Sequence, residues 1–178
     1  VLPPNGVRPR MPLTIGEPWP AWHALVRRGM WENSGRTLEV LVVLTPQPVA
    51  DLASMQQSAS SAMQVRGNGV LPLLGIESVG EGAGWIYPFR ELVSPAFFTE
   101  PTLGHRAAAE LVRDVALVLV DHEHPGPRLE DVLIDSEGGV WITNFAGPAL
   151  PLAEAPGPND TEAAAVYRLG ALLATLLA

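Results

Sequence analysis

The sequence predicts an α+β fold in two parts, a small β-rich N-terminal lobe followed by a reduced helical C-terminal lobe. Strand-like apolar runs dominate the first half of the chain, and LEVLVVL at 38–44 is the strongest of them. Helix-like apolar spacing dominates 103–121, and an almost uniformly apolar segment at 161–178 predicts a second helix. A chain of 178 residues is long enough for two small lobes that share an interface.

We expect the chain to divide into an arm at 1–20, an N-terminal lobe at 21–90 and a C-terminal lobe at 91–178. Six prolines fall in the arm, and proline neither donates a backbone hydrogen bond nor leaves its φ angle free. The arm is therefore expected to be extended and poor in regular structure. The start at Val1 and the end at Ala178, inside a helical pattern, suggest a segment of a larger protein.

The N-terminal lobe is expected to contain strands and one helix. The stretches 22–28 and 37–44 flank turn-like residues and predict a hairpin that leads into a buried strand. A helix is expected over 48–65, where apolar side chains at helical spacing predict core packing; these are Leu52, Met55, Ala59 and Met63. Two further strands are expected at 70–78 and 85–89, joined by a tight turn in the run GEGAG.

The C-terminal lobe is organised around residues 121–147, DHEHPGPRLEDVLIDSEGGVWITNFAG. This stretch is expected to hold a helix end, a constrained loop and two short strands joined by a tight turn. The helix at 103–121 leads directly into it. The segment 161–178 is apolar almost all round, so its helix is expected either to be buried at the centre of the lobe or to lie against a membrane.

The composition excludes several classes of function. A formal net charge of −8 argues against a nucleic-acid binder, whose affinity needs clustered cations. All 11 basic residues are arginine, which excludes chemistry that needs an ammonium side chain. Without cysteine there is no disulfide, no thiolate nucleophile and no cysteine-ligated zinc. The richness in Ala, Val, Leu, Gly and Pro suggests a GC-rich bacterial genome.

The order of elements around 121–147 resembles the catalytic loop and the metal-binding loop of serine/threonine protein kinases. The resemblance spans 22–178 and is most specific at 124–147 and 165–173. It implies a protein kinase-like two-lobed fold that ends after the central helix of the large lobe. In kinases a glycine-rich loop and a strand lysine hold ATP, an asparagine and an aspartate hold magnesium, and a second aspartate accepts the substrate proton.

In the N-terminal lobe the residues that would hold ATP are replaced. If LEVLVVL is the third strand of the kinase-like lobe, Val42 stands at the position of the ATP-binding lysine. Gln57 or Ser58 stands where the glutamate partner of that lysine would be. Where a glycine-rich loop is expected, this chain offers only Gly29 and Gly35, with bulky residues between them.

In the C-terminal lobe the catalytic chemistry is replaced as well. His124 matches the histidine of the catalytic-loop motif, but Gly126 replaces the catalytic aspartate and cannot accept a proton. Arg128 stands at the lysine position, Asp131 at the metal-binding asparagine and Asn144 at the metal-binding aspartate. The resemblance therefore implies no catalytic residue, with Arg128, Asp131 and Asn144 as the candidates for residual binding of nucleotide and metal.

These replacements imply a catalytically inactive pseudokinase domain, not an enzyme, that acts as a protein-interaction or regulatory scaffold and has no resident cofactor. Two alternatives remain open, a nucleotide-sensing pseudokinase with residual ATP and magnesium binding, and a kinase-fold enzyme with altered chemistry. A related type is the pseudokinase portion of the actinobacterial lipid II flippase, which recruits a forkhead-associated domain through a phosphothreonine. By analogy we expect a protein partner such as a phosphothreonine-reading domain, a cytoplasmic location, and contact with a membrane only through a flanking segment.

The run Asp121-His122-Glu123-His124 is the main alternative site. Two histidines with flanking carboxylates could join a metal site if the stretch were extended. No third ligand stands at motif spacing elsewhere, so we expect a helix end and one buried histidine. Hydrolysis by a Ser/His/Asp triad lacks a nucleophile elbow in this sequence.

Overall fold

The structure is a computed structural model that describes residues 12–45, 48–49, 51–95, 104–122, 124, 127–145 and 161–177, without the side chains of 161–166 and 168. The strands are β1 (Leu13–Pro18), β2 (Val26–Asn33), β3 (Arg36–Leu44), β4 (Gly75–Val79), β5 (Gly82–Pro88), β6 (Val132–Ile134) and β7 (Val140–Ile142). The helices are α1 (Leu52–Ser58), α2 (His105–Val120) and α3 (Thr161–Leu177), with short 3-10 helices η1 (Ala62–Gln64) and η3 (Leu129–Asp131). The element order confirms the predicted α+β class.

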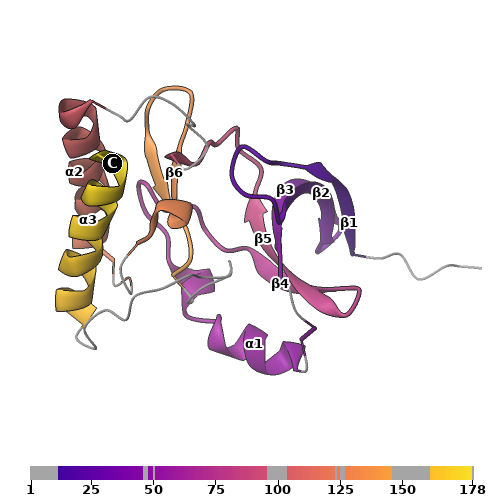
Figure 1. Cartoon of the computed structure of the whole chain (residues 1–178). Helices are drawn as coiled ribbons and strands as arrows, with labels where there is room; N and C mark the ends of the chain where they lie inside the picture. Colours follow the sequence, from indigo (N-terminus) through magenta and orange to yellow (C-terminus); the bar gives the residue numbers. More distant parts are fainter. Residues whose placement is uncertain are drawn as a thin grey trace, which may run out of the picture.

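The N-terminal part is a 5-stranded antiparallel sheet in the order β1-β2-β3-β5-β4. Its central strand β3 is buried on both faces, which explains why LEVLVVL is a continuous apolar run. Leu41 and Val43 pack on the face that α1 covers, whereas Val40 and Val42 pack on the opposite face with Trp31. Figure 1 shows this sheet with α1 beside it.

A tight turn joins β2 to β3, as the hairpin prediction requires. Ser34 and Gly35 have φ angles of 51° and 78°, which suit the two-residue turn that matches the twist of the strands. Asn33 pairs with Arg36 across this turn. Strand β2 therefore extends to Asn33, five residues beyond the end of the stretch predicted at 22–28.

Strand β1 lies inside the segment 1–20, for which we predicted little regular structure, and that prediction is wrong for Leu13–Pro18. Prolines occupy the ends of this stretch, at 12 and 18, and leave its middle free to pair with β2. The strand is also at the edge of the sheet, where proline is tolerated because one side needs no ladder hydrogen bonds. Residues 1–11 lie outside the described part.

Helix α1 is shorter than the helix predicted over 48–65. It begins after Asp51, whose carboxylate accepts a hydrogen bond from the Ser54 backbone at 3.1 Å, and it ends at Ser58. The chain then continues through a turn into η1. The apolar stripe nevertheless faces the core as predicted: Ala59 is buried, and Leu52, Met55 and Met63 pack against the same cluster.

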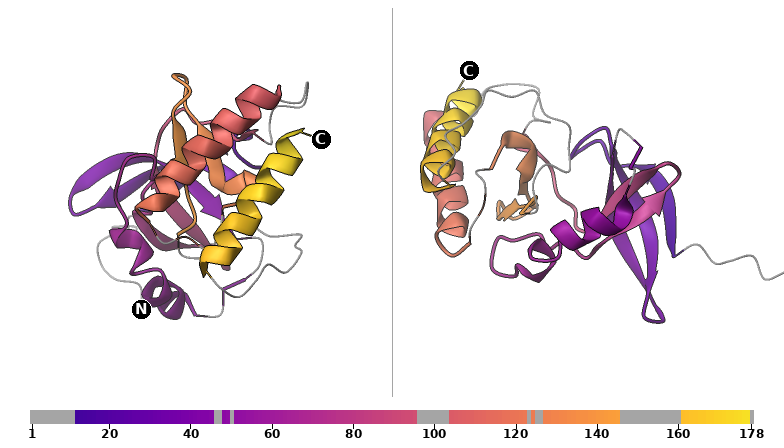
Figure 2. Two further views of the ribbon diagram at one scale, coloured as in Figure 1. Left: turned by 90° about the vertical axis from the view of Figure 1, so that its left-hand side faces the viewer. Right: turned by 90° about the horizontal axis from the view of Figure 1, so that it is seen from below.

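The C-terminal part consists of α2, α3 and the hairpin β6–β7, which lies between the helices and the sheet (Figures 1 and 2). The helices lie side by side, and their apolar faces pack on the hairpin. Leu172 and Leu176 of α3 are buried there, but Tyr167 is 49% exposed. The expectation that this helix is buried at the centre of the lobe is therefore wrong. Among the described residues, no helix is long and apolar enough to cross a membrane.

The two lobes are joined by backbone pairing. Leu71 donates to the Ile142 carbonyl at 2.9 Å, and Ile142 donates to the Gly69 carbonyl at 2.7 Å, so the segment before β4 lies along β7. Val93, in the linker after β5, pairs with Ile134 of β6 in the same way. Leu133 of the hairpin belongs to the core of the sheet. The lobes therefore form one continuous packed unit.

Candidate functional site

The candidate site lies where the hairpin β6–β7 begins and ends. Asp131 closes η3 directly before β6, and Asn144 stands two residues after β7. Because Val132 pairs with Ile142 across the hairpin, the two residues meet, and the Asn144 side-chain amide donates to Asp131 Oδ1 at 3.0 Å. The structure thus brings together Asp131 and Asn144, two of the three residues that the sequence analysis named as candidates for residual binding.

The Asp131 carboxylate is buried and both of its oxygens are engaged. Only 4% of the residue is exposed, and Oδ2 accepts a hydrogen bond from the Arg128 backbone amide at 3.0 Å while Oδ1 accepts from Asn144. Burial raises the pKa of Asp131 to about 6, although these hydrogen bonds and the Arg128 charge act to lower it. Asn144 is also buried and has a φ angle of 69°, a conformation that asparagine adopts more readily than most residues.

Val42 does not face the region between the lobes. Its side chain is fully buried on the face of the sheet opposite α1, in a cluster with Leu13 and Trp31. The neighbouring positions Leu41 and Val43 point to the face that α1 and the hairpin cover. A side chain of β3 that faces the region between the lobes would therefore come from Leu41 or Val43, and both of these are apolar.

The replacements proposed for the partner glutamate do not point inward either. Gln57 and Ser58 are exposed on α1, and the Ser58 hydroxyl donates to the Ser54 carbonyl at 2.9 Å. Among the polar side chains of α1, that of Gln56 reaches the sheet, where it donates to the Ile76 carbonyl at 2.7 Å. The sequence alignment named Gln57 or Ser58, and the polar side chain that reaches the sheet is one residue earlier, at Gln56.

Gly29 and Gly35 are parts of the β2–β3 hairpin and form no loop over the interlobe region. A Cβ atom at Gly29 would lie 2.5 Å from the Thr14 carbonyl oxygen, so this glycine permits the close approach of β1 and β2. The loop that links the first two strands is instead residues 19–25. Gly126, the residue at the catalytic aspartate position, lies outside the described residues, as does Pro125.

His124 is buried, as the sequence predicted for one histidine of the Asp-His-Glu-His run. Its Nε2 lies 2.9 Å from the Thr143 carbonyl oxygen, and its ring contacts the edge of Phe145 at 4.7 Å between centroids. His122 lies farther from the same ring, at 6.0 Å. In the part of the chain that the structure describes, which leaves out Glu123, no three His, Cys, Asp or Glu residues are placed to share a metal ion.

Trp22, in the β1–β2 loop, is the main residue of the interlobe region that the sequence analysis missed. It is 4% exposed, its indole nitrogen donates to the Glu130 carbonyl at 3.0 Å, and its ring meets Tyr87 at 5.5 Å between centroids. Nearby, the Trp19 indole donates to the Leu92 carbonyl at 3.2 Å. Two tryptophans within four residues between two strands were the available sequence signal.

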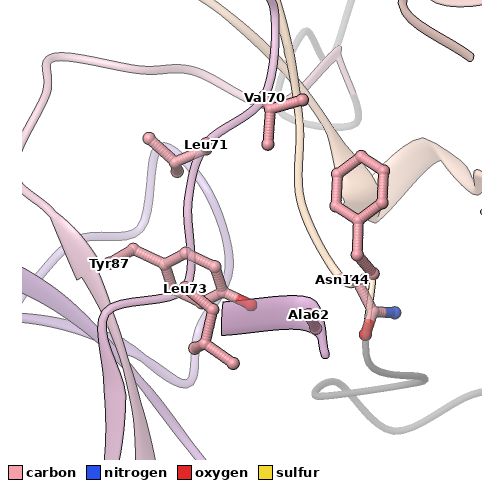
Figure 3. A pocket seen from close by; sticks show the side chains of 7 residues that line it. Ala62, Val70, Leu71, Leu73, Tyr87 and Asn144 are labelled. Atoms are coloured by element: carbon pink, nitrogen blue, oxygen red, sulfur yellow. The ribbon is translucent and has the colours of Figure 1, made fainter. Parts of the chain in front are cut away.

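Behind this region lies a cavity of about 10 Å³, room for roughly one water molecule. Tyr87 and Asn144 line it together with apolar residues (Figure 3). Burial raises the pKa of the Tyr87 hydroxyl far above its ordinary value, although a hydrogen bond from the Asn144 backbone opposes this shift. The hydroxyl therefore stays protonated at the site.

A twisted antiparallel sheet with one flanking helix, connected through a linker to a helical part that carries a short loop-and-hairpin unit, defines a protein kinase-like fold. No family model matches the chain, and no curated protein matches it. Among solved structures it is similar to Rad53 1-466 in complex with AMP-PNP, with a TM-score of 0.61 and 14% sequence identity. The match covers 93% of this chain and 48% of the Rad53 chain, so this chain spans about half the length of that protein. At this identity the likeness shows the fold alone.

Proposed function

We propose that this chain is a catalytically inactive kinase-like domain, a pseudokinase, that serves as a scaffold for a protein partner. The observation that carries the proposal is the direct hydrogen bond between Asp131 and Asn144. Magnesium binds in near-octahedral geometry to oxygen ligands, which must offer free lone pairs toward the ion. Here each Asp131 oxygen already accepts a hydrogen bond, one from Asn144 and the other from Arg128, and a metal ion would have to compete with these donors for the carboxylate.

The absence of lysine from the sequence supports the same proposal. Kinases place a strand lysine on the α- and β-phosphates, and this sequence contains no lysine. The side chains of β3 that face α1 and the hairpin are Leu41 and Val43, which are fully buried and apolar. The Rad53 structure was solved with AMP-PNP, so the fold holds a nucleotide in that protein. In this chain the groups that would grip its phosphates and metal are replaced.

The test of inactivity combines a thermal-shift titration with a phosphate-transfer assay. We expect no change in the melting temperature with ATP and magnesium, whereas a ligand at about 100 times its Kd would stabilise the folded state by about 2.7 kcal/mol. We also expect no transfer of phosphate by the wild type or by Gly126→Asp, because restoring a proton acceptor leaves the phosphates without their cation. A third variant adds Asp131→Asn and Asn144→Asp to Gly126→Asp, and it should remain inactive for the same reason.

Three outcomes would count against the proposal in different ways. Phosphate transfer by the wild type contradicts inactivity, and transfer by Gly126→Asp alone contradicts the claim that the cleft lacks the groups that hold ATP. A rise in melting temperature with ATP and magnesium, without transfer, favours the nucleotide-sensing alternative. Turnover of another substrate in the cleft favours a kinase-fold enzyme with altered chemistry.

The scaffold role is tested separately by capturing partners from the native host. Extracts would be divided into one portion depleted of nucleotide and one supplied with ATP and magnesium. We expect the same partner in both portions, because a scaffold of this kind needs no bound nucleotide. A partner that is captured only with ATP and magnesium would again favour nucleotide sensing.

A further inference from the structure

We propose that the β1–β2 loop, residues 19–25, is a built-in ligand of the interlobe cleft, and that the indole of Trp22 occupies the space that a nucleotide base would need. In a kinase-like lobe the loop that links the first two strands covers the phosphates and is rich in glycine. In this chain the same connection reads WPAWHAL and contains no glycine. This inference rests on the proposed function, since it explains how a kinase-like cleft remains closed without a nucleotide.

Trp22 is packed between the two lobes. It belongs to one buried cluster that includes Leu41 of β3, Tyr87 of β5 and Leu133 of β6, so this cluster draws side chains from both the sheet and the hairpin. Its indole nitrogen donates to the Glu130 carbonyl, in the residue directly before Asp131. The indole therefore reaches from the sheet to the edge of the Asp131–Asn144 pair.

The loop is also held by the linker between the lobes. The Ser94 backbone amide donates to the Ala21 carbonyl at 2.8 Å, and the Leu92 carbonyl accepts from the Trp19 indole at 3.2 Å. A ligand that entered this space would have to compete with the loop for both backbone groups. Trp19 also contacts the edge of Phe89, at 5.5 Å between centroids, which adds packing at the end of β5.

The shape and polarity of the Trp22 indole define the class of ligand that can replace it. The space holds a flat, mostly apolar bicyclic ring whose one N–H group donates to a carbonyl oxygen. An apolar cavity left by a truncated side chain can bind a small molecule of the same shape. The Trp22→Ala variant should therefore bind indole, whereas the wild type should not.

The experiment measures melting temperature with and without indole in the wild type, Trp22→Ala and a matched control, Trp141→Ala. Trp141 is a half-buried tryptophan on the hairpin whose indole donates to Asp135 at 2.9 Å, so its removal opens no enclosed cavity. We expect Trp22→Ala to lower the melting temperature by about 10 °C, because a buried tryptophan is lost. Indole at about 100 times its Kd should then raise the melting temperature of Trp22→Ala by about 5 to 10 °C and leave the other two proteins unchanged.

A second measurement keeps the inference testable if Trp22→Ala does not fold. Trp22→Phe keeps an aromatic ring but is smaller and has no indole N–H, so the indole proton signal that it loses identifies Trp22 in the NMR spectrum of the wild type. We expect that signal to exchange slowly with solvent, because the N–H is buried and hydrogen-bonded. Fast exchange of this proton would overturn the inference.

The inference also fails if folded Trp22→Ala gains no response to indole, or if the wild type responds equally. Neither result bears on catalysis, which the phosphate-transfer assay measures. Conversely, transfer of phosphate by the wild type would overturn the proposed inactivity while leaving the indole response of Trp22→Ala as a separate result. The two proposals can therefore fail independently.

Discussion

Replacing Leu133 with alanine is expected to lower the free energy of unfolding by about 2 to 5 kcal/mol. Leu133 is fully buried, and although it lies on strand β6 of the C-terminal hairpin it belongs to the main core cluster of the sheet, which also contains Trp22 and Leu41. Truncation removes buried apolar surface and leaves a cavity in the core that both lobes share. Filling this cavity would require side chains of both lobes to move. Chemical denaturation followed by tryptophan fluorescence and by far-ultraviolet circular dichroism measures the effect.

The two signals should shift together, because the residue belongs to a core that both lobes share. Leu117→Ala is the matched control, since it makes the same change at a residue of α2 that is 61% exposed. That variant should differ from the wild type by no more than about 0.5 kcal/mol. Separate transitions for the sheet and the helices, or a small effect of Leu133→Ala, would show that the lobes do not share a core.

The second large effect is a pH dependence that arises from Asp131. Its pKa is raised to about 6 in the folded protein because the carboxylate is buried, and its ordinary value is 3.8. The folded state thus binds the proton more tightly than the unfolded state does, so the group stabilises the fold fully below its ordinary pKa and loses this contribution as pH rises through about 6. Asp131→Asn is uncharged at every pH and removes this dependence.

We therefore expect the stability of Asp131→Asn relative to the wild type to increase by about 2 kcal/mol between about pH 4.5 and about pH 7.5. Denaturation of both proteins across this range measures the change, and other titrating groups cancel in the difference. Asp135→Asn is the control, because hydrogen bonds from Trp141 and from backbone amides lower the pKa of that half-buried carboxylate. Its difference from the wild type should stay constant over the same range. A constant difference for Asp131→Asn as well would show that this carboxylate is not held in a buried environment.

Local sequence signals predicted most of the elements that build the fold. Apolar periodicity located β3 and α2, and the pair Ser34-Gly35 formed the tight turn expected between two strands. Errors occurred where one residue of register matters, as at Val42, which points to the opposite face of the sheet from its neighbours. A strand alternates faces at every residue, so a continuous apolar run does not reveal which side faces the cleft.

The candidate site was only partly predictable. Aligning the hairpin by its motif placed Asp131 and Asn144 in corresponding roles, and the structure brings them into contact. Their burial, and the resulting pKa of Asp131, depend on side chains from the sheet that no local pattern identifies. The β1–β2 loop was not recognised as a loop between two strands, because the prolines of segment 1–20 led us to predict no strand where β1 lies.

By itself, the sequence determined which residue types the chain lacks, because the absence of lysine and cysteine needs no coordinates to be recognised. It also determined the order of the strands and helices other than β1, since the patterns that mark these elements are local in the chain. Only the tertiary structure decided what fills the space between the lobes. Trp22 and its hydrogen-bond partner Glu130 are 108 residues apart, and such a contact forms only when the sheet, the linker and the hairpin pack together.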